Sequence, residues 1–207
     1  MIVSHAKQFV FFAVPKTGTH AVRELLSSHK GPDDWEQQIL FGEQISPIPE
    51  IAKIQHGHIS AQQIAPHLEK AVWDNYFKFA IVRNPFDRFI SVCFFLNRQN
   101  PKFVETPLQW MKSAIVVPRF RRRVLVAPQY LQLTYAQGNI AMDYVGRYEK
   151  LQDSVDEICG KLQIESTPLK KKNASEHQQY REYYDDELKS MVGKFYREDL
   201  KRFGYSF

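Results

Sequence analysis

A short loop with a lysine, a glycine and two threonines follows the first long apolar run of the sequence. The run, residues 9–14, has the continuous hydrophobic character of a strand that is buried on both faces. We expect Pro15 to end this strand, Gly18 to allow close approach of a ligand, and Thr19 to cap a following helix. The backbone N–H groups of such a loop and helix end, together with the Lys16 ammonium, favour binding of an anion.

A second strand-turn-helix segment also carries a cation at its turn. Residues 78–82 predict a buried strand, Arg83 begins the turn, and residues 87–97 have the broad apolar face of a helix. In open α/β sheets, ligands bind beyond the carboxyl ends of the strands. Two such ends, with Lys16 and Arg83, therefore indicate one ligand with two separated anionic groups. Lys16 precedes Gly18, which differs from the nucleotide-triphosphate loop that ends in Gly-Lys-Ser/Thr.

Length and composition limit the possible classes of protein. A chain of 207 residues suits one domain over residues 1–207. The net charge of +5 suits an anionic ligand but is too small to indicate nucleic acid by itself. Cys93 and Cys159 provide neither a disulfide framework nor a metal cluster. Without an apolar stretch of roughly 18 residues or a signal peptide, we expect a cytoplasmic protein with no membrane partner. The sequence does not determine the oligomeric state.

The remaining pattern predicts an α/β fold with a mostly parallel sheet flanked by helices. We expect a short helix or lid within residues 27–55, a loop-rich segment over residues 98–128, a third strand over residues 143–149, and helices over residues 61–68, 129–137, 151–162 and 184–203. Arg119 and Arg121–Arg123 form a basic run in the loop-rich segment. Such a run is either a solvated surface or an electrostatic guide for an acidic acceptor.

Three segments resemble the sulfotransferases that use 3′-phosphoadenosine-5′-phosphosulfate (PAPS), and the resemblance extends over the whole chain. Pro15–Thr19, PKTGT, is similar to their 5′-phosphosulfate loop. Arg83–Ser91, RNPFDRFIS, is similar to their 3′-phosphate motif, in which the arginine and the serine contact the phosphate. Asp199–Tyr205 is similar to the tail of the branch that includes carbohydrate O-sulfotransferases. The resemblance implies a P-loop-like phosphosulfate-binding loop, PAPS as co-substrate, 3′,5′-adenosine bisphosphate (PAP) as product, and no metal.

The resemblance also implies roles for individual residues. Lys16 would balance charge on the leaving oxygen, while Arg83 and Ser91 would hold the 3′-phosphate. A lysine run in a loop after Pro168 is a further candidate for the cofactor. The complete set expected to bind the cofactor is Lys16, Thr17, Gly18, Thr19, His20, Arg83, Ser91, Lys171, Lys172 and Asn173.

Three histidines are candidates for the catalytic base. His56-Gly57-His58 is similar to a His-Gly-His segment of uronic-acid 2-O-sulfotransferases, in which a histidine is the base. In an extended segment two such rings face the same side, so we expect His58 as the base and His56 as its partner. The alternative is a turn with two surface histidines. His20 departs from the family pattern, and a helix N-terminus would keep it neutral, so it is either a rival base or a residue that shapes the pocket.

These features together predict in-line transfer of a sulfuryl group from PAPS to an acceptor hydroxyl. The acceptor is expected to be a carbohydrate or another small polar molecule. Two alternatives remain open: a non-catalytic adenine-nucleotide-binding protein, and a nucleotide kinase-like enzyme. The missing Gly-Lys-Ser/Thr weakens the kinase alternative, and the scattered basic residues do not form the continuous stripe of a nucleic-acid binder.

Overall fold

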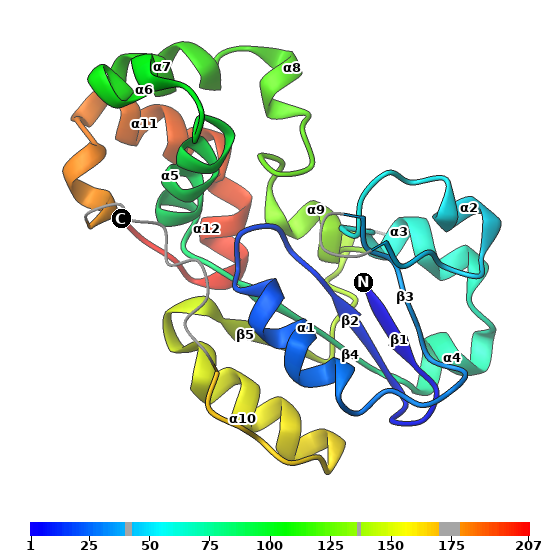
Figure 1. The fold of residues 1–207 in the computed structure, drawn as a ribbon. Coiled ribbons are helices and arrows are strands. Elements are labelled where there is room, and N and C mark those ends of the chain that lie inside the picture. Colours follow the sequence, from blue (N-terminus) through cyan, green and yellow to red (C-terminus); the bar gives the residue numbers. More distant parts are fainter. Residues whose placement is uncertain (40–42, 136–137, 170–178) are drawn as a thin grey trace. The chain divides into compact units, whose positions relative to one another are not determined.

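The computed structural model describes residues 1–39, 43–135, 138–169 and 179–207 (Figure 1). The chain forms two compact units, and each is assembled from two segments: Met1–Val82 with Leu131–Lys172, and Arg83–Tyr130 with Asn173–Phe207. The prediction of one domain over residues 1–207 stays a prediction. None of the helices in the described ranges has both the length and the apolar character needed to cross a bilayer. The cytoplasmic location also stays a prediction.

A five-stranded sheet forms the centre of the first unit, with the strand order β3-β1-β2-β4-β5. Strand β2 pairs in parallel with β4, and β4 pairs in parallel with β5, whereas β1 is antiparallel to both β2 and β3. The α/β class is therefore confirmed, but the sheet is mixed rather than mostly parallel. The strands are β1 (Ile2–Ser4), β2 (Phe9–Phe12), β3 (Trp35–Glu36), β4 (Phe77–Val82) and β5 (Tyr144–Arg147).

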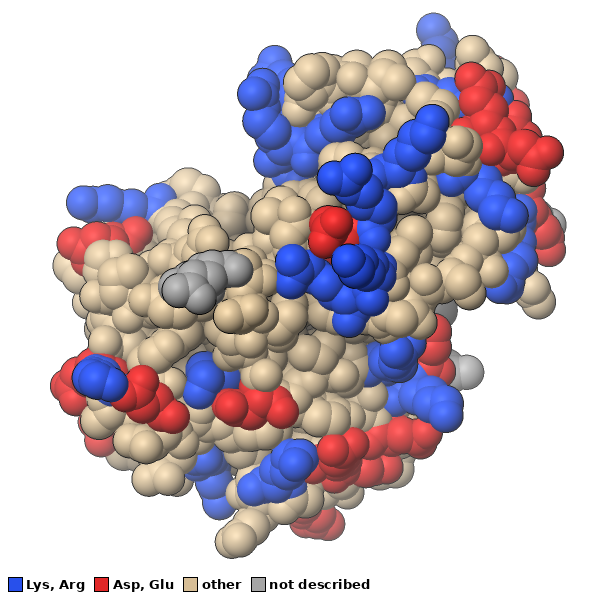
Figure 2. Space-filling view, turned by 180° about the vertical axis from the view of Figure 1, so that it is seen from behind, with Lys and Arg blue, Asp and Glu red and all other residues tan. Residues whose placement is uncertain are grey.

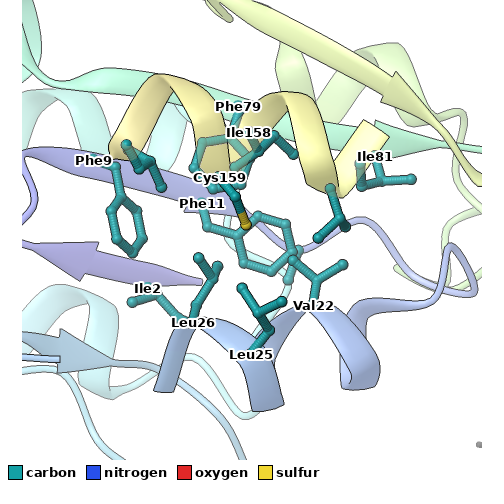
Figure 3. Close-up of a cluster of buried hydrophobic side chains, with 13 residues drawn as sticks. Ile2, Phe9, Phe11, Val22, Leu25, Leu26, Phe79, Ile81, Ile158 and Cys159 are labelled. Carbon is teal, nitrogen blue, oxygen red and sulfur yellow. The ribbon is translucent and has the colours of Figure 1, made fainter. Parts of the chain in front are cut away.

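The continuous apolar run of β2 has the physical cause that the sequence indicates. One set of alternating side chains, including Phe11 and Phe79, packs against helices α1 (Thr19–Ser27) and α10 (Leu151–Leu162) (Figure 3). The rings of Phe11 and Phe79 stack with their centroids 5.3 Å apart. Val10 on the opposite face of β2 is fully buried as well. Since both faces are covered, no position in this strand alternates to a polar residue.

Short helices complete the first unit. Among the described residues they include α2 (Pro49–Ala52), α3 (Ala61–Ile64), α4 (Lys70–Asn75) and the 3₁₀ turns Ala65–His67 and Tyr148–Lys150. Ser60 caps α3, because its side chain accepts from Gln63 N–H in a complete capping box. Trp35 belongs to a strand rather than to the expected short helix. Helix α9 (Gln129–Leu133) contributes residues to both units.

The second unit, as far as the structure describes it, is helical. Its elements are α5 (Pro85–Leu96), α6 (Pro101–Glu105), α7 (Pro107–Ile115), α8 (Pro118–Arg121), a 3₁₀ turn Tyr180–Tyr183, α11 (Asp186–Phe195) and α12 (Arg197–Phe203). The expectation of loops over residues 98–128 is wrong, because three prolines there occupy first-turn positions, where a missing N–H costs nothing. The long helix predicted over residues 184–203 is two helices, and Gly204 ends the second with φ of 62°.

Candidate active site

The loop after β2 is held in an unusual backbone conformation. Lys16 has φ of 66° and Gly18 has φ of 78°. Lysine rarely adopts positive φ, and strain of this kind is concentrated at ligand sites. The buried Thr17 closes the loop, since its Oγ1 donates to the carbonyl oxygen of Val14 at 2.9 Å. A Cβ at Gly18 would lie 2.7 Å from Leu151 Cδ2, so any other residue would have to displace this side chain in addition to adopting the unfavourable torsion.

The loop leads directly into the N-terminus of α1. Gly18 is the N-cap and Thr19 is the first helical residue, so the prediction that Thr19 caps the helix is wrong by one position. No side chain caps this end, and its first turn holds no acidic residue. The positive end of the helix dipole and the N–H groups of the first turn thus lie beside Lys16, where an anion is favoured. His20 is the second residue of α1 and is half-buried.

His58 lies beside the start of this loop. Its Nδ1 is 2.6 Å from the carbonyl oxygen of Ala13, the residue that follows β2. Because a carbonyl only accepts, Nδ1 carries the hydrogen and Nε2 carries the lone pair. Burial lowers the pKa of His58 to about 3, the Ala13 hydrogen bond opposes this, and the positive charge of Arg23 adds to the lowering. His58 is therefore neutral at physiological pH, with Nε2 as the basic atom.

His56 and Gly57 fix the backbone of His58. The N–H of His58 donates to His56 Nδ1 at 3.3 Å, and burial lowers the pKa of His56, which favours the neutral ring that this bond needs. A Cβ at Gly57 would lie 2.4 Å from the carbonyl oxygen of Gln37, so only glycine fits between the two histidines. The alternative of two surface histidines is not what the structure shows, since both rings are half-buried.

Arg23 of α1 ties the same segment to the rest of the first unit. Its guanidinium pairs with the buried Glu36 and also donates to the carbonyl oxygens of Gln37 at 3.3 Å and Gly57 at 3.5 Å. Arg23 was not predicted, because its partner Glu36 lies 13 residues further along the chain and the helical spacing of α1 does not distinguish Arg23 from a solvent-exposed arginine.

Arg83 in the second unit is almost buried, with 6% of its surface exposed. Its Nε donates to Asp87 Oδ2 at 2.7 Å. The side-chain amide of Gln129 binds both backbone polar groups of Arg83. Its Oε1 accepts from Arg83 N–H at 3.0 Å, and its Nε2 donates to Arg83 C=O at 2.9 Å. The carboxylate of Asp199 accepts from the N–H groups of Gln129 and Tyr130 at 2.8 and 2.9 Å. A chain of buried polar groups thus sets the position of Arg83.

Ser91 is buried, whereas the arginines of the basic run are exposed. Ser91 lies on α5 with 2% of its surface exposed. Lys171, Lys172 and Asn173 lie outside the described residues. In the run from Arg119 to Arg123 all four arginines are exposed. Figure 2 shows that Lys and Arg side chains are gathered in groups on the face that it presents. Arg121 has a structural contact, because its guanidinium stacks 5.3 Å from the Phe195 ring centre.

Two further features of the described residues bear on the site. A cavity of about 510 Å³ lies at the amino ends of the parallel strands, between His5, Trp35 and Tyr76, on the edge of the sheet away from the loop. In α/β sheets, ligands bind at the carboxyl ends of the strands, so we do not assign this cavity to the reaction. No three His, Cys, Asp or Glu side chains gather in the described ranges as a metal site needs. The expectation that no metal takes part stays a prediction.

Comparison with known proteins identifies the family. A family model described as "Sulfotransferase family" matches residues 1–206. Neither the curated proteins nor the solved structures gave a match to the chain. The family match covers all but the last residue, and it agrees with the class of fold and with a loop and helix end that favour a bound anion. The chain therefore belongs to the sulfotransferase family and is a sulfuryl-transferring enzyme.

Proposed function

We propose that this enzyme transfers the sulfuryl group of PAPS to an acceptor hydroxyl, with His58 as the general base. The single observation that carries the role of His58 is the 2.6 Å contact from its Nδ1 to Ala13 O, which leaves Nε2 as the basic atom beside the Lys16 loop. PAPS is the donor that the sulfotransferase family generally uses. Family membership favours this function over a non-catalytic nucleotide-binding protein or a nucleotide kinase.

The donor is assigned to the two motifs according to the charge that each can neutralise. The N–H groups of the loop and of the first turn of α1, from Lys16 to His20, bind the 5′-phosphate and the sulfuryl group. Arg83 and Ser91 bind the 3′-phosphate, because a guanidinium donates well to phosphate oxygens. By resemblance alone, Lys171, Lys172 and Asn173 complete the set.

The reaction is an in-line displacement at sulfur. The acceptor oxygen attacks the sulfur atom, His58 Nε2 takes its proton, and the bond from sulfur to the 5′-phosphate oxygen breaks with its electron pair staying on that oxygen. Lys16 balances the charge that develops there, and PAP leaves. The low pKa of His58 keeps Nε2 unprotonated before the reaction. The negative charge of a bound donor raises that pKa and so favours proton transfer during the reaction.

For the acceptor we propose a carbohydrate or another small polar molecule. The resemblance of His56-Gly57-His58 supports a carbohydrate, and the exposed arginines between Arg119 and Arg123 support a polar or anionic one. A panel of neutral sugars, uronic-acid sugars, simple alcohols and phenols, incubated with PAPS labelled in the sulfuryl group, tests donor and acceptor together. Absence of labelled product with every hydroxyl compound, while PAP binds, would contradict the transfer function.

The role of His58 is tested with one alcohol and one acidic phenol. A phenol ionises without much help, whereas general-base catalysis is worth roughly 10²–10⁴-fold for an alcohol. We expect His58→Ala to lose most activity toward the alcohol and little toward the phenol. His56→Ala should have a smaller effect in the same direction. If His20→Ala, rather than His58→Ala, shows the selective loss, the base lies on α1.

A further inference from the structure

A buried glutamine joins the start of the Lys16 loop to the His58 segment. Gln132 on α9 has 8% of its surface exposed. Its Nε2 donates to the carbonyl oxygen of Ala13 at 3.0 Å and to that of Ile59 at 3.2 Å. A primary amide has two N–H donors, one for each of these bonds. The side chain therefore connects the residue that follows β2 to the residue that follows His58.

The Ala13 carbonyl is shared between Gln132 and His58. Its oxygen has two lone pairs, and it accepts from Gln132 Nε2 at 3.0 Å and from His58 Nδ1 at 2.6 Å. With the carbonyl held by the amide, the imidazole has one favourable orientation, with Nδ1 toward Ala13. A flipped ring would lose this bond and leave the Ala13 oxygen with one donor fewer.

We propose that Gln132 is a positioning residue for His58: it holds the Ala13 and Ile59 carbonyls so that the imidazole stays in the Nδ1–H tautomer with the Nε2 lone pair available to the acceptor. This inference rests on the proposed role of His58 as the base. Gln132 touches neither donor nor acceptor in this scheme. Its loss should therefore lower kcat for acceptors that need a base and should leave the KM for PAPS unchanged.

The chemistry of position 132 accounts for the choice of glutamine. Methionine has a similar length but no donor, so the Ala13 and Ile59 carbonyls would each lose one hydrogen bond. Glutamate has the same shape, but its carboxylate would face two carbonyl oxygens. Lysine would bring an additional charge into a buried place. The amide alone supplies two neutral donors from one nitrogen.

The tautomer of His58 tests the proposal without any substrate. Nitrogen NMR of ¹⁵N-histidine-labelled protein distinguishes a protonated Nδ1 from a protonated Nε2. We expect the native protein to show the Nδ1–H form at His58, and Gln132→Met to show a mixture of both forms. If the native protein shows the Nε2–H form, the proposal is overturned before any variant is made. Gln132→Glu is the second variant should Gln132→Met not fold.

Kinetics supply the second readout. We expect Gln132→Met to lower kcat for an alcohol about 10-fold, in the range of other substitutions that misorient a reacting group, and to affect a phenol less. Gln129→Met is the matched control, because this second buried glutamine of α9 bonds to Arg83 and not to Ala13. It should leave the His58 tautomer unchanged and raise the KM for PAPS.

The outcomes separate the two proposals. If His58→Ala is slow with alcohols but Gln132→Met keeps both the native tautomer and the native ratio of alcohol to phenol rates, then Gln132 does not position His58 and the base assignment stands. If His58→Ala is as active as the native enzyme with alcohols, the base assignment fails, and the role of Gln132 in catalysis fails with it.

Discussion

The Lys16 loop and the Arg83 turn each follow a parallel strand, but they hold their cation in different ways. At the loop, torsions do most of the positioning: Lys16 and Gly18 have positive φ, and the Thr17 hydroxyl closes the turn on the backbone. At the turn, side chains do it: Asp87 fixes the Arg83 guanidinium and Gln129 fixes its backbone. The conformation from Lys16 to Gly18 therefore depends mainly on local torsions, whereas the backbone of Arg83 depends on Gln129, which is far away in the chain.

The two regions should therefore respond differently to substitution. The donors of the loop are mostly backbone N–H groups, so a side-chain substitution leaves them in place as long as it leaves the backbone torsions unchanged. The turn relies on the buried Asp199, whose carboxylate accepts two N–H bonds at the start of α9. Loss of Asp199 would leave these donors unsatisfied and would loosen Gln129 and then Arg83. Substitutions distant from the turn should thus weaken the binding of the donor.

Of the substitutions in these two regions, Lys16→Ala is expected to have the largest effect on turnover. Removal of a charged group that acts on the leaving oxygen costs about 10²–10³-fold in kcat. The loss should be similar for an alcohol and a phenol, because the leaving group is the same, and PAP should still bind. Lys53→Ala removes an exposed lysine of the same unit and serves as the control. Unchanged turnover of Lys16→Ala would show that the strained loop acts through its backbone alone.

Arg83→Ala should act on binding rather than on turnover. Loss of a hydrogen bond to a charged group costs roughly 1.5–3 kcal/mol, and this loss should appear for PAP but hardly for AMP, which lacks the 3′-phosphate. Calorimetry with both nucleotides measures it. The exposed Arg98, also in the second unit, provides the control Arg98→Ala. Equal affinity of the native enzyme for AMP and PAP would remove the 3′-phosphate from this motif.

Local sequence was sufficient to predict the elements that carry the motifs. Apolar runs and helical spacing indicated β2, β4, α5 and α10, because each buries a face whose periodicity is visible in a short window. The failures have physical reasons. Strand β1 is three residues long and has no pattern of its own, and the prolines at the starts of α6, α7 and α8 resemble loop residues until the helix is known.

The candidate site was predicted only as far as its motifs. The sequence placed Lys16, His58 and Arg83, since each belongs to a short recognisable segment. It gave no sign of Gln129 or Gln132, and it marked Asp199 only as part of the C-terminal segment, without a role. All three act through hydrogen bonds to distant backbone groups. A buried glutamine has no local signature, because its partners are set by how the chain folds. The supporting residues of a site are therefore the part that the structure adds.

Gly18→Ala tests whether torsion and space both limit the loop. Alanine at positive φ costs about 1 kcal/mol, and the contact with Leu151 at 2.7 Å should add about 1–2 kcal/mol of overpacking. Gly138→Ala is a matched control, because Gly138 has φ of 74° and an added Cβ there meets nothing within 4 Å. Urea unfolding should therefore show a greater loss for Gly18→Ala than for Gly138→Ala. Equal losses would mean that torsion alone selects Gly18.

The two regions should also respond to pH with opposite sign. The pKa of His58 is lowered from 6.5 to about 3, mainly by burial, so between these values the unfolded chain binds a proton that the folded chain does not. This contribution to stability is complete above pH 6.5 and is lost as the pH falls toward 3. Burial raises the pKa of Asp199 above 3.8, so its contribution is present below 3.8 and is lost as the pH rises through the folded value.

Unfolding free energies at pH 7 and pH 5 measure the His58 term. From this residue we expect the native protein to lose about 1–2 kcal/mol over that interval. His58→Asn keeps a donor in the place of Nδ1 but does not titrate, so this variant should lose less unfolding free energy between pH 7 and pH 5. Part of the loss that remains comes from His56, whose pKa is also lowered. Asp199→Asn removes the opposing contribution of this carboxyl, so stability should no longer be regained as the pH falls through the folded pKa of Asp199. Parallel pH curves for the native protein and His58→Asn would show that His58 is solvated in solution, and its neutral, base-competent state would then need another cause than burial.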